Sequence, residues 1–393
     1  MLTPQQRAIV KCTVPLLESG GEALTTHFYN ILLAEHPEVR PFFNQAHQAS
    51  GDQPRALANG VLMYARHIDE LEQLGPLVST IINKHVSLQI EPAHYPLVGA
   101  CLLRAIREVL GAEVASDEVL AAWGAAYQQL ADILIDAEET IYAETAAAPG
   151  GWRGARAFRV ARKVAESGEI TSFYLAPQDG GALASFKAGQ YIGLRLVVDG
   201  QEIRRNYSLS AAPNGLQYRI SIKREASGVA SSFLHDELND GDVLDVFPPA
   251  GDFVLRAGDK PLVLISGGVG ITPTLAMLDV ALQGTRPVHF IHFARNRAAH
   301  AFRDAIDARN TRHSQLKRFY VYDEHSGPTD APHATGRVSN QQLSEWLPRS
   351  RDVDAYFLGP KPFMRQVKKQ LLELGVPQAQ TRYEFFGPAS ALD

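Results

Sequence analysis

The chain has few cysteines, no long apolar run and no dense stretch of one charge. Cys12 and Cys101 are the only cysteines in 393 residues and lie far apart, which excludes a disulfide framework and a cysteine-rich metal site. No apolar run approaches the about 20 residues that span a bilayer, so stable membrane insertion is not expected. The formal net charge is -5 and no Lys/Arg run occurs, which argues against nonspecific nucleic-acid binding.

The remaining composition is ordinary for a globular protein. A chain of 393 residues is long for one hydrophobic core, so two or three domains are expected. The segment 1–6 lacks the charged-then-apolar pattern of a signal peptide, and a cytoplasmic location is therefore the expectation. No internal repeat or low-complexity tract is present.

Residues 1–148 have helical periodicity throughout and are predicted to form an all-α domain. Thr3 and Pro4 are a helix start signal, because a hydroxyl can cap the helix and proline tolerates its first position. Further helices are predicted, with glycines and prolines between them, at 22–35, 55–72, 76–89, 96–110 and 117–143. The segment 144–151 is predicted to be a linker.

Residues 151–256 consist of short β-rich pieces, which predict a small antiparallel β-barrel. Turn residues such as Asp199-Gly200 and Asn214-Gly215 separate these pieces. The predicted strands are 170–175, 191–198, 218–223 and 243–247, with one short helix at 230–238.

Residues 259–393 alternate strands with helices, which is typical of an α/β fold with a doubly wound parallel sheet. Strands are predicted at 262–266, 288–293, 319–322 and 355–358. A sheet of this kind binds its ligand at the carboxyl ends of the strands.

Two of the predicted helices carry an ionisable residue inside an apolar stripe. His85 shares a helix face with Leu77 and Ile81, and Glu138 interrupts the apolar stripe 120–141. A lone buried carboxylate is costly, so Glu138 needs a partner, and a ring N–H of His85 would satisfy both groups. The pattern leaves open a plain core histidine and a glutamate that reaches solvent.

A glycine-rich turn links a buried strand to a helix within 261–273. Glycines let the backbone approach a pyrophosphate, and the following helix N-terminus offers free N–H groups and a positive dipole. The segment 205–208 precedes this turn, and 359–364 and 383–388 follow it. In the segment 205–208, the guanidinium of Arg205 suits a phosphate, and the phenol of Tyr207 and the hydroxyl of Ser208 suit an isoalloxazine ring.

This ordered set of motifs resembles the ferredoxin reductase-type flavin and nicotinamide modules. The resemblance implies flavin contacts at Tyr191, Arg205, Asn206, Tyr207, Ser208, Ala230, Ser231 and Ser232, and in the terminal segment Glu384, Phe385, Phe386, Gly387 and Pro388. It implies nicotinamide-cofactor contacts at Gly268, Val269, Gly270, Ile271, Thr272, Pro273, Gly359 and Pro360.

Three features of the second half of the chain leave choices open. Leu358 stands where such modules usually have cysteine, and Arg204 is an alternative to Arg205 as the phosphate ligand. Arg295 and Arg297 follow the strand 288–293, where they either bind a 2′-phosphate, favouring NADPH, or are solvated surface charges. Both NADH and NADPH therefore stay open.

The helical half carries a second resemblance. The segments 36–44 and 51–57, followed by His85, Tyr95 and Trp123, resemble the globin half of bacterial flavohaemoglobins. The resemblance implies His85 as the proximal haem ligand, supported by Glu138 and Tyr95, with Phe43 on the haem face, Tyr29 and Gln53 as distal donors to oxygen, and Leu57 shaping the pocket.

Together the two resemblances cover essentially the full chain and imply haem b, FAD and NADH or NADPH as cofactors. The implied activity is that of a nitric oxide dioxygenase, which converts NO and O2 to nitrate. The alternatives are an oxygen-binding or oxygen-sensing globin with its own haem reductase, and a general flavin or peroxide reductase. A lipid chain in the distal haem pocket is a further possibility known for this family, and a monomer is expected.

Overall fold

The computed structural model describes residues 2–44, 48, 50–324, 327, 331–387 and 392. These residues form two compact units. The helical unit comprises Met1–Ala147 with the short segment Asp199–Arg204 and with Gly387, and the second unit comprises most of the remainder. Within the described residues, no helix is both long and apolar enough to cross a membrane.

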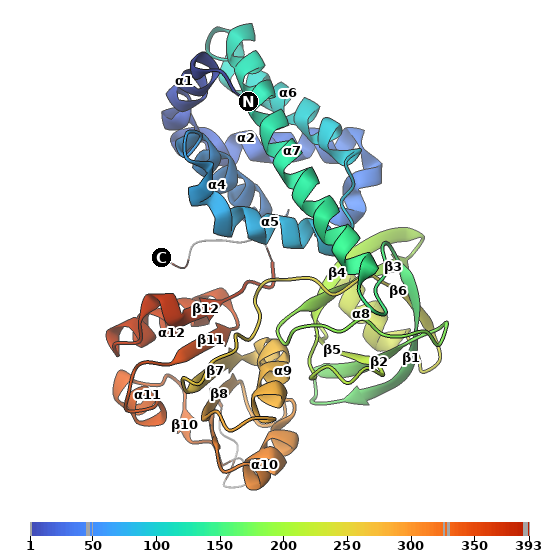
Figure 1. Ribbon diagram of the computed structural model, residues 1–393, viewed down its shortest axis with the longest axis vertical. Coiled ribbons are helices and arrows are strands. Elements are labelled where there is room, and N and C mark those ends of the chain that lie inside the picture. The colour runs from blue at the N-terminus through green and yellow to red at the C-terminus, as the bar shows by residue number, and fades with distance from the viewer. Residues whose placement is uncertain are drawn as a thin grey trace. The chain divides into compact units, whose positions relative to one another are not determined.

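The helical unit is built from six α-helices and two short 3-10 helices among its described residues (Figure 1). Their bounds are α1 Pro4–Cys12, α2 Val14–Glu35, η1 Pro37–Phe42, α4 Asp52–Arg66, η2 Leu71–Leu74, α5 Gly75–Leu88, α6 His94–Val114 and α7 Asp117–Ala147. The predicted start of α1 is confirmed, because Thr3 Oγ1 accepts from Gln6 N and Gln6 Oε1 accepts from Thr3 N. Helix α2 packs on α4 and α6, and their shared apolar faces form one core.

Several predicted helix limits in this unit are wrong, among them the end of the helix 96–110, which continues to Val114 in α6. Helix α2 begins eight residues earlier than 22, since Gly20 and Gly21 lie inside it, and a Cβ on Gly21 would meet Ala58 of α4 at 3.5 Å. Helix α4 ends at Arg66, and 71–74 form a separate 3-10 turn. Helix α7 continues through Ala147, into the segment 144–151 that is predicted to be a linker, because alanines favour helix.

The first part of the second unit is a six-stranded antiparallel sheet with strand order β4-β3-β6-β1-β2-β5. Its strands are β1 Arg156–Ala165, β2 Ile170–Pro177, β3 Tyr191–Val198, β4 Gln201–Ser208, β5 Tyr218–Lys223 and β6 Val243–Val246, and its helix is α8 Val229–Asp236. An antiparallel bridge joins Leu209, just after β4, to Ile220 of β5. The two edge strands therefore meet, as a barrel requires.

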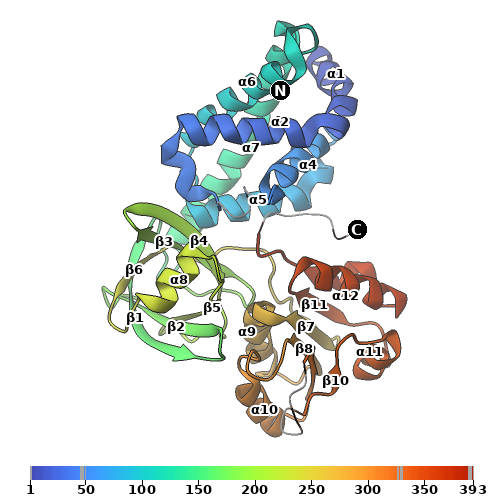
Figure 2. The same cartoon turned by 180° about the vertical axis from the view of Figure 1, so that it is seen from behind.

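The last part is a parallel six-stranded sheet with strand order β10-β9-β8-β7-β11-β12 (Figures 1 and 2). Its elements are β7 Leu262–Gly267, η3 Gly268–Gly270, α9 Ile271–Ala281, β8 Val288–Ala294, α10 Arg303–Arg312, β9 Leu316–Tyr322, β10 Ala334–Thr335, α11 Asn340–Trp346, β11 Asp354–Leu358, α12 Lys361–Glu373, η4 Gln378–Gln380 and β12 Thr381–Tyr383. Strand order reverses between β7 and β11, so this sheet has its topological switch point there.

Both faces of the parallel sheet are buried, which explains its apolar strands. Leu262 and Leu264 of β7 belong to a core that contains α9, whereas Val263 and Ile265 belong to a core that contains α11 and α12. Successive side chains of a strand point to opposite faces, so helices cover the sheet on both sides. The predicted doubly wound fold is confirmed.

Candidate active site

In the helical unit, three elements bring a histidine, a glutamate and a tyrosine together. His85 Nδ1 lies 2.7 Å from Glu138 Oε1, and the Tyr95 hydroxyl donates to the same oxygen over 2.7 Å. Glu138 is only 2% exposed, and these two donors supply the partners that its burial requires. Burial, with the hydrogen bond to Glu138, raises the pKa of Tyr95 well above its usual value. The predicted hydrogen bond between His85 and Glu138 is present.

Two residues that sequence reasoning did not select hold Tyr95 in place. The hydroxyl of Tyr127 donates to the Tyr95 carbonyl over 2.7 Å. Gly99 makes this possible, because a Cβ there would lie 2.6 Å from a ring carbon of Tyr127. Tyr127 stands in the apolar stripe of α7, but no local signal shows which carbonyl it reaches.

On α2 and α4, the predicted distal residues also lie together. Tyr29 is 7% exposed, its ring meets that of Phe43 edge-on at 5.5 Å, and its hydroxyl forms a hydrogen bond with Gln53. Burial raises the pKa of Tyr29 far above the usual value despite that hydrogen bond. Leu57 lies about one turn after Gln53 on α4 and is partly buried against the same core.

Thr25 is a further residue that the sequence did not reveal. Its hydroxyl is buried and donates to the Pro54 carbonyl over 2.8 Å. This bond fixes the first turn of α4 against α2, so Thr25 positions Gln53 relative to Tyr29.

These residues fit a haem group. Both hydrogen bonds of His85 use Nδ1, and among the described residues Nε2 has no such partner, so it is available as a ligand atom. Apolar side chains that are only partly buried line the same core, among them Phe43, Leu57, Leu77, Val78 and Val98. Apolar side chains that stay partly exposed in this core, together with an imidazole nitrogen that has no hydrogen bond, suit a planar apolar cofactor.

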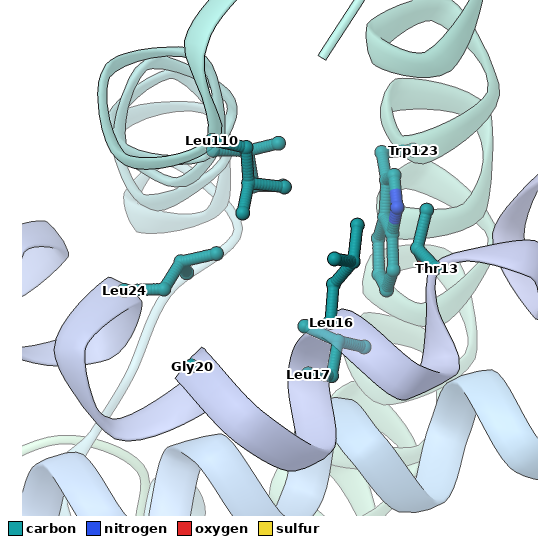
Figure 3. Close-up of a pocket in the computed structure, with 8 residues that line it drawn as sticks. Thr13, Leu16, Leu17, Gly20, Leu24, Leu110 and Trp123 are labelled. Atoms are coloured by element: carbon teal, nitrogen blue, oxygen red, sulfur yellow. The ribbon is translucent and has the colours of Figure 1, made fainter. Parts of the chain in front are cut away.

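A separate apolar cavity of about 10 Å³ lies between α2, α6 and α7, lined by residues that include Leu17, Leu24 and Trp123 (Figure 3). None of the predicted site residues lines it. It has room for at most about one water molecule, and Leu17, Leu24 and Trp123 in its lining belong to the apolar core.

Replacing a glycine inside α2 should stabilise the helical unit. An added Cβ on Gly20 meets no atom within 4 Å, so Gly20→Ala should raise its free energy of unfolding by about 0.5–1 kcal/mol. Gly99→Ala is the contrasting variant, because its Cβ would clash with Tyr127. Thermal unfolding of the haem-loaded protein measures both, and a lower transition temperature for Gly20→Ala would contradict the packing described.

In the second unit, the predicted flavin residues occupy the end of β4. Arg205 and Tyr207 are half-buried and Ser208 is buried, whereas Asn206 is exposed. Burial lowers the pKa of Arg205 and raises that of Tyr207. A guanidinium withdrawn from water in this way suits an anionic group such as a pyrophosphate.

Arg204 belongs to the helical unit, and its guanidinium is occupied there. It donates to the Leu88 carbonyl over 2.6 Å, lies 4.4 Å from the ring centre of Phe42 and pairs with Glu202 at 2.7 Å. These contacts favour Arg205 over Arg204 as the phosphate ligand.

The second predicted flavin segment begins helix α8. Ala230 and Ser231 are buried and Ser232 is half-buried. The Ser231 hydroxyl accepts from Glu225 N and donates to the Gly228 carbonyl, both over 3.1 Å, so it stabilises the turn that leads into the helix. The buried ring of Tyr191 lies against Gly251, where a Cβ would come within 2.7 Å of it.

The two predicted nicotinamide segments meet at the switch point of the parallel sheet. Gly268, Val269 and Gly270 form the turn after β7, and Ile271, Thr272 and Pro273 begin α9. A Cβ on Gly270 would lie 2.4 Å from the Leu358 carbonyl, and one on Gly359 would lie 3.2 Å from Gly267 N. Glycine therefore lets the turns after β7 and β11 pack closely at the switch point, the place where sheets of this kind bind a pyrophosphate.

The remaining predicted residues lie at the end of β11 and after β12. Leu358 is buried at the end of β11 within the core, and Pro360 is exposed before α12. After β12, Phe385 meets the ring of Tyr383 edge-on, Phe386 is 48% exposed and Glu384 is half-buried. Lys84 Nζ donates to the carbonyl of Gly387 within the helical unit. Pro388 lies outside the described residues.

Comparison with known protein families agrees with this arrangement. Residues 26–134 match the globin family, 157–255 the oxidoreductase FAD-binding domain and 264–369 the oxidoreductase NAD-binding domain. A globin joined to these two modules defines an oxidoreductase that uses haem, FAD and a nicotinamide cofactor.

Full-length relatives narrow the class to one family. The chain is 69% identical over 393 residues to a flavohemoprotein of Burkholderia sp. (strain TH2) and 67% identical to one of Pseudomonas aeruginosa, with complete coverage of both. The crystal structure of a Malassezia yamatoensis flavohemoglobin with bound FAD and heme matches with a TM-score of 0.87 and 26% identity, covering 98% of this chain and all of that one. The chain belongs to the flavohemoprotein family.

Proposed function

We propose that this protein is a nitric oxide dioxygenase that converts NO and O2 to nitrate with electrons from a nicotinamide cofactor. The observation that carries the proposal is the hydrogen bond between His85 and the buried Glu138 in a globin that is fused to FAD- and NAD-binding modules. One solved relative, the FAD/NAD-binding part of a Vibrio cholerae nitric oxide dioxygenase, is 37% identical with a TM-score of 0.56, covering 60% of this chain and all of that one.

The three cofactors divide the chemistry between them. When bound, the nicotinamide supplies a hydride, FAD splits the electron pair and haem performs O2 chemistry. Arg205 and the first turn of α8 would hold the flavin phosphates, and the glycine-rich turn at 268–270 would hold the dinucleotide. His85 would hold the haem iron through Nε2.

On the proximal side, Glu138 sets the electronic character of His85. Its carboxylate accepts the Nδ1 proton over 2.7 Å, which raises the basicity of the opposite ring nitrogen. Tyr95 donates to the same oxygen and restricts how that carboxylate can turn. A histidine with imidazolate character favours oxygen activation over reversible oxygen carriage.

On the distal side, Tyr29 would donate a hydrogen bond to the oxygen substrate. Its raised pKa keeps the phenol protonated at physiological pH, so its O–H stays available as a donor. The Gln53 amide would act as donor to the phenol oxygen, which would leave the Tyr29 proton for the oxygen substrate. Hydrogen-bond donors lower the activation barrier when they are already in place where negative charge develops.

The first test is the visible absorption spectrum of the purified protein, followed by NADH oxidation in air with and without NO. The proposal predicts haem and flavin bands and oxidation strongly stimulated by NO. Both cofactors without an NO response would favour an oxygen-binding or oxygen-sensing globin. Equal turnover with artificial acceptors or hydroperoxides would favour a general reductase.

Three further parts of the proposal concern the surroundings of the protein rather than its chemistry. The apolar side chains near Leu57 would also accept a lipid chain, and mass spectrometry of the purified protein tests for one. A cytoplasmic location is proposed as well, since the reaction draws on the nicotinamide pool of the cytoplasm. A monomeric state is also proposed.

A further inference from the structure

Helix α5, which carries His85, ends in a strained turn. After Leu88, Gln89 adopts the left-handed conformation with a φ of 58°, which costs free energy in residues other than glycine. In the same turn, Ile90 N donates to the carbonyl of His85 over 3.0 Å. The turn is therefore joined to the residue that would hold the haem iron, and contacts from other elements must help to stabilise it.

One such contact reaches the carbonyl of Leu88. The last carbonyls of an α-helix have no hydrogen-bond partner within the helix. Here Arg204 Nη1, which is 116 residues away in sequence, donates to the Leu88 carbonyl over 2.6 Å. Its positive charge also interacts favourably with the helix dipole at this end. Arg204 thus stabilises a turn that the backbone conformation of Gln89 disfavours.

The guanidinium of Arg204 is fixed on two further sides. Its Nε lies 2.7 Å from a carboxylate oxygen of Glu202, and only 15% of the Arg204 side chain is exposed. Its central carbon lies 4.4 Å from the ring centre of Phe42, the last residue of η1. Phe42 is followed by Phe43, which is predicted to lie on the haem face. Arg204 therefore contacts α5 and η1, both of which lead directly to predicted haem contacts.

The next residue of strand β4 is Arg205, the favoured flavin-phosphate ligand. Successive side chains of a strand point to opposite faces, so the two guanidinium groups serve different surroundings. Arg205 is half-buried, and burial lowers its pKa. Two consecutive residues of one strand would thus bind the flavin phosphate and the end of the helix that carries His85.

We propose that Arg204 is a positioning residue for electron transfer from flavin to haem, because it fixes the turn after His85 to the strand whose next residue would hold the flavin phosphate. When both groups are bound, one electron leaves the reduced flavin and converts ferric to ferrous iron, and no covalent bond forms or breaks. The inference rests on the electron path of the proposed function but not on its use of NO. Arg204 acts through α5 and not as a carrier of the electron.

The test follows flavin reduction and haem reduction separately in the holoprotein after anaerobic mixing with NADH, without NO. In Arg204→Met, the flavin should be reduced at the native rate, because Arg205 and the nicotinamide site are unchanged. Haem reduction should be about tenfold slower, since small displacements of reacting groups have effects of at least this size. Neither NO nor O2 is present, so a failure of the dioxygenase proposal leaves this measurement intact.

Two further variants separate loss of the contact from general damage. Arg204→Lys keeps the cation and a donor, so haem reduction should return to within about threefold of the native rate. Arg195→Met is the matched control, because Arg195 lies on the neighbouring strand β3 and both of its hydrogen bonds go to Asp245. Its haem reduction should equal that of the native protein. A native rate in Arg204→Met, or an equal loss in Arg195→Met, would overturn the inference.

Hydrogen exchange at the end of α5 gives a readout that does not depend on turnover. Without the bond from Arg204, the turn should open more often, so the amides of Gln89 and Ile90 should exchange about tenfold faster in Arg204→Met. The amides of α1 should keep their native exchange rates, which would exclude unfolding of the whole helical unit. If haem reduction slows while Gln89 and Ile90 exchange as in the native protein, Arg204 does not act through α5 and the inference fails.

Discussion

Tyr29→Phe should make O2 dissociate from the reduced holoprotein about 10- to 100-fold faster. The variant keeps the aromatic ring and its edge-on contact with Phe43 but removes the one donor that Tyr29 offers. A hydrogen bond to a partly charged acceptor contributes about 1.5–3 kcal/mol, and about 1.4 kcal/mol corresponds to a tenfold change in rate. Flash photolysis or stopped-flow mixing measures the dissociation rate directly.

Tyr64→Phe is a suitable control because it removes a hydroxyl from a tyrosine that is also buried. Tyr64 donates to the Ala126 carbonyl over 2.9 Å, and burial raises its pKa to about 12. Its loss should cost stability, since a buried carbonyl loses its donor, but it should not change O2 release. If Tyr29→Phe and Tyr64→Phe release O2 at the same rate as the unmodified protein, Tyr29 does not face the ligand.

Much of the fold follows from local rules that the sequence displays. Strands β3 and β5 coincide with their predicted ranges, because turn residues such as Asp199-Gly200 and Asn214-Gly215 lie beside them. The turn after β7 could be recognised because a strand, glycines and a helix follow one another without a gap. The His85 and Glu138 pair could be inferred because a carboxylate inside an apolar stripe requires a donor.

Other features depend on contacts between residues that are distant in sequence. Gly20 and Gly21 suggest a helix break when read locally, yet α2 runs through both because it packs closely on α4. The partner of Thr25 lies 29 residues away, and the partner of Arg295 lies 126 residues away. No periodicity or propensity in the sequence encodes such pairs. The contact that supports Gln53 and the ion pair of Arg295 could therefore be recognised only in the folded structure.

Glu138→Gln should lower NO-dependent turnover about 10- to 100-fold, the usual cost of losing the partner of a metal-binding histidine. The substituted amide would keep the size of the side chain and an oxygen at the same position. It could still accept from His85 and Tyr95, which both approach Oε1 at 2.7 Å in the native protein. What the variant removes is the negative charge, so His85 should lose imidazolate character and push less electron density onto the iron.

Resonance Raman spectroscopy separates this electronic effect from a structural one. The iron–histidine stretching frequency should fall in Glu138→Gln, together with turnover. Tyr142→Phe is the control on the same helix, because its hydroxyl donates to the Ile90 carbonyl over 2.8 Å. That variant should keep both the frequency and the turnover of the native protein. An unchanged frequency and unchanged turnover in Glu138→Gln would show that the carboxylate serves only to satisfy buried donors. The residue that favours oxygen activation would then have to be sought on the distal side, at Tyr29.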